Sequence, residues 1–253
     1  MSLRSFLTSL LESLPLIISF DMSINLTLGT TYFNNPEDIL IFIDKHHPFV
    51  DELIIVDDGS DVYPITDIVQ PTDKIKLYRV TKDYGFNSHG CRNLIMSKTA
   101  NNWTILLDSD RNFISPEEAI FNIKRKQLTK NTRYQFIAHV LAKGNNMHNS
   151  VNDYMIHRDH FFSVGGYDEE LIGVRDGDRD FFKQLENNGN ERVLDGCDII
   201  LTRESTHRLD NDIVKSKNDT KRISNEIKEL IRKRSLEPEP NKPILTFEWK
   251  HIT

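Results

Sequence analysis

The sequence has few cysteines, no excess of basic over acidic residues and no long apolar run, and each absence excludes a class of protein. Two cysteines among 253 residues cannot build a disulfide scaffold or a multi-cysteine metal site, so a reducing, cytoplasmic location is expected. A net charge of −6 argues against a protein held mainly by nucleic-acid phosphates. No window holds the roughly 18 uninterrupted apolar residues that a membrane span needs.

The closest approach to an apolar run is Met1–Phe20, which Arg4, Glu12 and Pro15 interrupt. A signal peptide is not favoured, because Arg4 is its only basic residue and no small-x-small cleavage site follows. We expect an amphipathic helix over about Leu3–Ser13 that packs on the domain or touches a partner.

What is present is the composition of a soluble globular protein, with 38% apolar and 28% charged residues. The first half alternates short apolar runs with helical patterns, as in βαβ units on a mostly parallel sheet. We expect one domain over residues 1–253, with Ser88 as the N-cap of a helix that runs to about Thr99. The expected strands are 24–29, 52–56, 74–80, 103–107, 134–141, 151–157 and one within 191–201, and the expected helices are 36–47, 88–99, one starting at 115, 178–188 and 224–233.

Acidic clusters stand where apolar runs end: Asp57-Asp58, Asp108-x-Asp110 and Asp176-x-Asp178-x-Asp180. In open α/β sheets, ligands bind beyond the carboxyl ends of the strands. Carboxylates gathered there repel one another unless a cation is bound. A divalent ion that prefers oxygen ligands, Mn²⁺ or Mg²⁺, resolves this conflict, and it takes only one or two protein carboxylates when substrate phosphates supply the rest.

Five motifs follow one another over about residues 24–182: Thr30–Asn34, Glu52–Ser60, Gly90–Leu94, Leu106–Asp110, and Gly165–Glu169 with Gly177–Phe181. In this order they resemble the GT-A-fold glycosyltransferases of the family 2 type. The resemblance implies an α/β, Rossmann-like nucleotide-diphospho-sugar transferase fold with a mostly parallel central sheet flanked by helices. It also implies a nucleotide-sugar half at about 24–115, an acceptor and catalytic half at about 116–210, and a C-terminal helix and strand within 211–253.

The resemblance implies a metal-dependent transfer from a nucleoside-diphosphate sugar, expected to be of the UDP type, to a glycan or other hydroxyl-bearing acceptor. Asp110 is expected to coordinate the metal, and Asp108 to contact the ribose or the metal. The resemblance also implies His207 as a further ligand that would complete the metal shell. Residues expected to contact the nucleotide sugar are Thr30, Tyr32, Asp57, Asp58, Arg92, Asp108 and Ser109, with Arg92 directed at the diphosphate.

On the acceptor side, the resemblance implies inversion of the anomeric centre by a carboxylate that removes the proton of the attacking hydroxyl. Asp178 is the preferred base and Asp180 the second choice. The family often has Glu-Asp where this sequence has Gly177-Asp178, so one acid is missing and Asp176 could compensate. His89, close to Arg92, is a weaker candidate for a phosphate contact.

Other readings stay open. The chain could bind sugar nucleotides without transferring the sugar, or it could be a phosphotransferase with a DxD motif, although Arg111-Asn112 after Asp110 suits that class poorly. Arg92 could form a surface ion pair only. Basic clusters at 124–126 and 232–234 allow a polyanionic acceptor such as nucleic acid, but solvated helix charge is the usual explanation of such clusters.

Overall fold

The computed structural model describes residues 23–82, 84–140, 146–172, 177–189, 191–194, 200–203, 229, 232 and 243–253. Several expected features lie outside the described residues: the N-terminal helix, Asp176, His207 and, except for positions 229 and 232, the helix at 224–233. None of the helices in the described ranges is long and apolar enough to cross a membrane.

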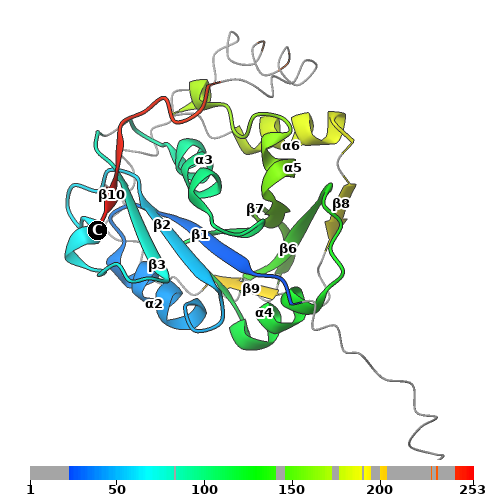
Figure 1. The fold of residues 1–253 in the computed structure, drawn as a ribbon, viewed down its shortest axis with the longest axis horizontal. Helices are drawn as coiled ribbons and strands as arrows, with labels where there is room; N and C mark the ends of the chain where they lie inside the picture. The colour runs from blue at the N-terminus through cyan, green and yellow to red at the C-terminus, as the bar shows by residue number, and fades with distance from the viewer. Residues whose placement is uncertain are drawn as a thin grey trace, which may run out of the picture.

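Ten strands of the described chain form a single sheet that spans both halves of the sequence (Figure 1). Their order is β10-β3-β2-β1-β4-β7-β6-β9-β5, with β8 paired to β6. The strands are β1 Leu26–Tyr32, β2 Glu52–Asp57, β3 Ile75–Val80, β4 Trp103–Asp108, β5 Arg111–Phe113, β6 Thr132–Val140, β7 Asn146–His157, β8 Glu191–Leu194, β9 Ile200–Arg203 and β10 Trp249–Ile252.

The centre of the sheet confirms the expected parallel arrangement, since β3, β2, β1 and β4 are neighbours that all run the same way. Every residue of β2 is buried, as expected for strands covered on both faces. β1 was expected to end at Gly29 but continues to Tyr32. The extension is stable because Thr31 pairs with both Val56 of β2 and Asp108 of β4.

The other half of the sheet is mixed rather than parallel. β7 runs antiparallel to both β4 and β6, while β8 and β9 each run parallel to β6. The expected strand within 191–201 is therefore two short strands that pair along different parts of β6. The antiparallel pairing of β7 places Tyr154 opposite Leu106, next to the end of β4.

Helices cover both faces of the sheet, α2 and α4 on one face and α3, α5 and α6 on the other (Figure 1). Each face has its own hydrophobic core, one around Phe42 and Ile120, the other around Ile95 and Phe181. The helices are α2 Pro36–His46, α3 Ser88–Lys98, α4 Pro116–Arg125, α5 Arg158–Phe162 and α6 Gly177–Asn187, with short 3₁₀ turns η1 Ile65–Asp67 and η3 Glu169–Leu171.

The helix starts follow the expected chemistry, with one difference. α2 begins with Pro36 after Asn35, whose side chain accepts from the backbone of Asp38, as N-cap residues do. α3 begins at Ser88, so its N-cap is Asn87 and not Ser88.

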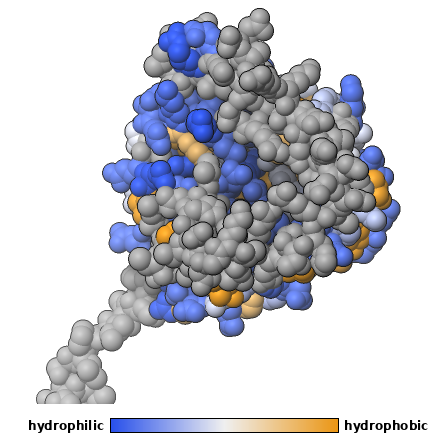
Figure 2. Space-filling model, turned by 180° about the vertical axis from the view of Figure 1, so that it is seen from behind, coloured by the Kyte–Doolittle hydropathy of each residue, from blue (hydrophilic) through white to orange (hydrophobic). Residues whose placement is uncertain are grey.

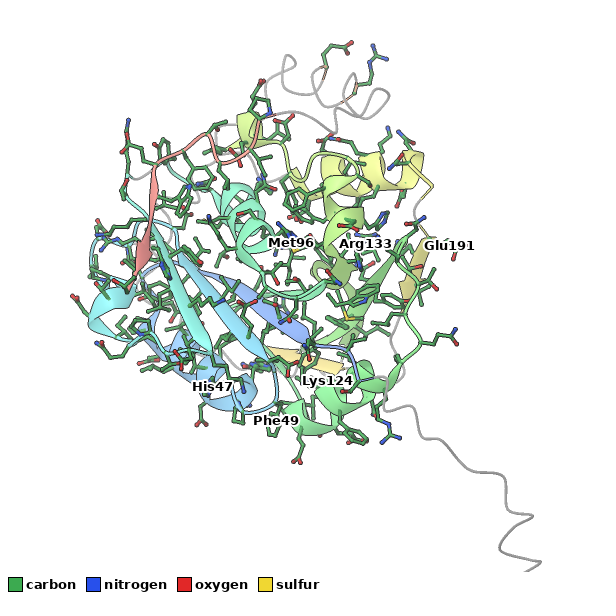
Figure 3. All side chains as sticks on the ribbon, in the orientation of Figure 1. His47, Phe49, Met96, Lys124, Arg133 and Glu191 are labelled. Carbon is green, nitrogen blue, oxygen red and sulfur yellow. The ribbon has the colours of Figure 1, made fainter. Side chains whose placement is uncertain are left out.

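In Figure 3, His47 and Phe49 after α2 lie across the sheet from Met96 of α3. Where described residues are visible from behind, hydrophilic ones prevail and hydrophobic ones are scattered (Figure 2).

Candidate functional site

The carboxyl ends of β1, β2 and β4 meet at one edge of the sheet. Tyr32 is in register with Asp57, and Thr31 with Asp108. This parallel register brings Asp57 and Asp108 to the same edge, although they are 51 positions apart in the sequence. The sequence-based prediction that these acidic clusters share an edge is therefore confirmed for the first two.

Arg92 of α3 links the second acidic cluster to the third. Its Nη2 donates to Asp108 Oδ1 at 2.9 Å, and its Nη1 donates to Asp178 Oδ1 at 3.0 Å. The Arg92 side chain is only 2% exposed, so the alternative that Arg92 forms an ion pair at the surface is wrong. Nη1 also donates to the hydroxyl of Tyr167 at 3.1 Å, and Nη2 to the carbonyl of Asn152 at 2.9 Å. In this arrangement the guanidinium holds protein groups, two of them carboxylates.

Residues of β7 complete the surroundings of Asp108, and sequence reasoning missed them. The backbone N–H of Asp108 donates to Asp153 Oδ1 at 2.9 Å, and Asn152 Nδ2 lies 3.4 Å from Asp108 Oδ2. The polar pair Asn152-Asp153, directly before the apolar run Tyr154–Ile156, was a detectable signal. Its meaning depends on the antiparallel register of β7 against β4, which no local pattern reveals.

Two buried tyrosines continue the network on the other side of Arg92. Tyr167 donates from its hydroxyl to Asp178 Oδ1 at 2.7 Å, and the hydroxyls of Tyr154 and Tyr167 are 2.8 Å apart. Burial and the neighbouring carboxylate of Asp178 raise the pKa of Tyr167 well above its usual range. Tyr167 therefore stays protonated and remains a hydrogen-bond donor to Asp178.

The two candidate bases differ in position. Asp178 belongs to the Arg92 network and its side chain is 14% exposed. Asp180 is buried on α6, where its Oδ2 accepts from Gln184 Nε2 at 2.6 Å. Asp178 therefore joins the same cluster as Asp108, and Asp180 contacts a neighbour on its own helix.

The nucleotide-side candidates are buried and support a loop. Asp57 Oδ1 accepts from the backbone of Ser60 at 2.8 Å, and its Oδ2 from that of Ile65 at 3.1 Å. Tyr32 donates to the carbonyl of Tyr63 in the same loop at 2.6 Å. Burial raises the pKa of Asp57 above its ordinary value. Thr30 is likewise buried in β1. These residues therefore form the protein wall behind the carboxyl ends of β1 and β2.

Asp58 connects this loop to α3, because its Oδ2 accepts from the backbone N–H of Asn87, the N-cap residue, at 3.1 Å. The carboxylate thus faces the positive end of the helix dipole, where negative charge is favoured. Of the first acidic cluster, Asp57 fixes the loop and Asp58 fixes the start of the helix that carries Arg92.

The donor set suits a divalent ion shared with a substrate. The side chains of Asp108 and Asp110 are 31% and 25% exposed, on either side of Ser109 in a tight turn. Loss of hydration raises the pKa of Asp108 against the pull of Arg92, and the nearby carboxylates of Asp110 and Asp178 raise it further. Among the described residues, no group of three or more His, Cys, Asp or Glu forms a closed metal site. Two carboxylates and a diphosphate would supply the oxygens that Mg²⁺ or Mn²⁺ requires.

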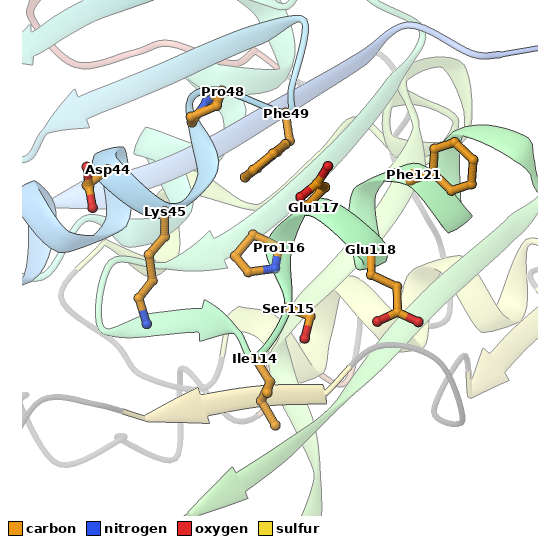
Figure 4. Close-up of a pocket in the computed structure, with 10 residues that line it drawn as sticks. All are labelled: Asp44, Lys45, Pro48, Phe49, Ile114, Ser115, Pro116, Glu117, Glu118 and Phe121. Atoms are coloured by element: carbon orange, nitrogen blue, oxygen red, sulfur yellow. The ribbon is translucent and has the colours of Figure 1, made fainter.

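A cavity of about 820 Å³ lies on the opposite face of the sheet from Arg92 and is unrelated to this cluster (Figure 4). It lies between the end of α2 and the start of α4, with Phe49 and Phe121 among its walls. No residue predicted from the sequence to act in binding or catalysis lines it. Volume by itself therefore does not identify the functional site here; convergent polar groups do.

Comparison with known proteins defines the fold. No protein-family model and no curated protein sequence matches the chain. Among solved structures, one similar to this chain is GalNAc-T7 crystallised with UDP, GalNAc and Mn²⁺, at a TM-score of 0.56 and 12% identity. The match covers 85% of this chain and 55% of that one. The protein has the fold of the GT-A glycosyltransferases.

Proposed function

We propose that the protein transfers a sugar from a nucleoside-diphosphate sugar, of the UDP type, to a hydroxyl group of an acceptor, with a divalent metal ion. The observation that carries this proposal is the buried Arg92, which binds Asp108 at 2.9 Å and Asp178 at 3.0 Å. One side chain thus joins the strand-end carboxylate of the DxD motif to the candidate base. The UDP and Mn²⁺ named for the structural neighbour GalNAc-T7 support the same class of donor.

In this proposal Asp108 and Asp110 would hold the metal ion through their carboxylate oxygens, and the bound ion would offset the charge of the departing diphosphate. Arg92 keeps Asp108 in place and balances its charge before the donor arrives. The oxygens of Asp110 lie in a turn that is partly open to solvent, where a donor can approach. Asp57 and Asp58 contribute indirectly by fixing the loop and helix around this edge.

Asp178 acts as the general base in this proposal. The acceptor oxygen attacks the anomeric carbon as the bond from that carbon to the diphosphate oxygen breaks, and the hydroxyl proton passes to the carboxylate. Asp178 Oδ1 is held by Arg92 and Tyr167, which leaves Oδ2 to receive the proton. A single displacement of this kind inverts the anomeric configuration.

The proposal is tested by incubating the protein with nucleotide sugars, Mn²⁺ and candidate glycan acceptors and measuring released nucleoside diphosphate. Asp178→Asn should lower kcat about 10²–10⁴-fold, the usual contribution of a general base, with little change in donor affinity. Asp73→Asn, which alters an exposed carboxylate far from the cluster, is the matched control and should leave kcat unchanged. An active Asp178→Asn enzyme, or product of retained configuration, would contradict the proposed mechanism. Mn²⁺-dependent binding of a nucleotide sugar without any release would favour the non-catalytic binding protein.

A further inference from the structure

His89 is a buried polar side chain that the proposed mechanism does not use. It lies in the first turn of α3 and is 0% exposed. Its ring stacks on Tyr167 with centroids 5.2 Å apart and meets the edge of Phe86 at 5.8 Å. Among the residues that the structure describes, neither ring nitrogen has a hydrogen-bond partner. Buried polar atoms are seldom left in this state unless they have a functional role or an additional partner.

The candidate base lies close to this ring. His89 Nε2 lies 3.9 Å from Asp178 Oδ2, the carboxylate oxygen that neither Arg92 nor Tyr167 contacts. The separation is longer than a hydrogen bond, but catalytic hydrogen bonds are often long before substrate binds and shorten in the complex. Burial lowers the pKa of His89, so the imidazole is neutral and has one N–H to donate.

Gly177 makes this approach of α6 to α3 possible. A Cβ on residue 177 would lie 2.6 Å from His89 Nε2 and 2.7 Å from its Nδ1. No side chain fits there while the ring keeps its position. The glycine directly before Asp178 therefore lets the histidine ring lie against the backbone that carries the carboxylate.

We propose that His89 is a positioning residue for Asp178. In the complex with donor, Nε2–H donates to Oδ2 and fixes the plane of the carboxylate, whose other oxygen is already held by Arg92 and Tyr167. A second lone pair of Oδ2 stays available for the proton of the acceptor hydroxyl. This inference rests on the proposed function, since it gives His89 the role of orienting the proposed general base, Asp178.

Two amide variants separate positioning from packing. The amide nitrogen of His89→Gln can reach the place of Nε2, whereas that of His89→Asn reaches only the place of Nδ1. We expect His89→Asn to lower kcat about 10–100-fold, because small displacements of a catalytic group have effects of this size, with the donor KM unchanged. The kcat of His89→Gln should stay within about 3-fold of the wild-type value, because its amide nitrogen keeps the donor in place. Equal losses in both variants, or a loss of kcat accompanied by an equal loss of donor affinity, would overturn the proposal.

A measurement that does not depend on turnover tests the contact itself. Long-range ¹H–¹⁵N spectra of the His89 imidazole, recorded with UDP and Mg²⁺, should show the Nε2–H tautomer, and Asp178→Asn should shift its signals. Signals that are identical in the wild type and Asp178→Asn would overturn the contact. If the contact is present but the wild type releases no nucleoside diphosphate from any sugar nucleotide, the proposed function fails and the His89–Asp178 pairing stands as structure alone.

Discussion

Arg92→Met is the substitution that most directly probes the network at the sheet edge. Methionine fills much of the same apolar volume but removes all four donated hydrogen bonds, to Asp108, Asp178, Tyr167 and Asn152. Two of these bonds go to carboxylates, and each hydrogen bond to a charged group is worth roughly 1.5–3 kcal/mol. The variant therefore leaves two acids close together without their shared cation.

The magnitude follows from the burial of the three groups. Removing one partner of a buried ion pair costs about 3–5 kcal/mol. Arg92 is 2% exposed, but the side chains of Asp108 and Asp178 keep 31% and 14% exposure, so water relieves part of the loss. We expect the free energy of unfolding to fall by about 3 kcal/mol, the lower end of that range.

Urea unfolding followed by circular dichroism measures this change, with Arg158→Met as the control. Arg158 is exposed, and a surface change of this kind should stay within about 0.5 kcal/mol. Adding Asp178→Asn to Arg92→Met should recover part of the loss, because one of the two unpaired charges is then absent. A variant Arg92→Met that is as stable as Arg158→Met would refute the assignment of Arg92 as the residue that holds both acids.

Three further predictions concern packing, pH and the chemistry. Gly29→Ala should lower the free energy of unfolding by about 1–3 kcal/mol in the same urea assay, because a Cβ there would overlap Ile95 Cγ2; an unchanged midpoint would contradict the packing of α3 on β1. Burial raises the pKa of Tyr32 above its ordinary value, so its contribution to stability is complete below pH 10 and is lost as pH rises above 10, where unfolded tyrosine releases its proton. Unfolding measured from pH 8 to 11 should therefore show a smaller decline in Tyr32→Phe than in the wild type, and an equal decline would count against the burial of this hydroxyl. The loss of kcat in Asp178→Asn should persist across acceptors, since the proton is removed in each reaction; a loss confined to one acceptor would instead indicate a binding role.

Much of the fold was predictable because its signals are local. Asn35-Pro36 marks the start of α2, and the apolar run before Asp108 marks β4. Apolar runs ending in acids also predicted which edge of the sheet carries Asp57 and Asp108. The resemblance predicted Asp178 as the base and directed Arg92 at the diphosphate, and both stay predictions. Within the protein, the Arg92 side chain donates to the carboxylates of Asp108 and Asp178.

The parts that sequence reasoning missed depend on contacts between distant segments. Asn152, Asp153 and Tyr154 reach Asp108 and Arg92 only through the antiparallel pairing of β7 with β4. Tyr167 joins because two consecutive glycines with positive φ, Gly165 and Gly166, turn the chain just before it. Neither the strand register nor the direction of that turn can be read from local patterns. The family often has an acid where this chain has Gly177. The structure gives a physical reason, because the ring of His89 lies against residue 177 and leaves no room for a side chain.

The most direct test of a metal-dependent nucleotide-sugar site at this edge is the Mn²⁺-dependent stabilisation of the protein by UDP. Thermal unfolding of the wild type and Asp110→Asn is followed with UDP, with Mn²⁺, and with both together. With both ligands, the wild type should gain about 2.7 kcal/mol of stability when UDP is at 100 times its Kd, and it should gain little with either ligand alone. Asp110→Asn should lose this gain while unfolding normally without ligands. A wild type that UDP and Mn²⁺ do not stabilise, or an Asp110→Asn variant that they stabilise equally, would contradict the assignment of Asp108 and Asp110 as the carboxylates that hold the metal and the donor.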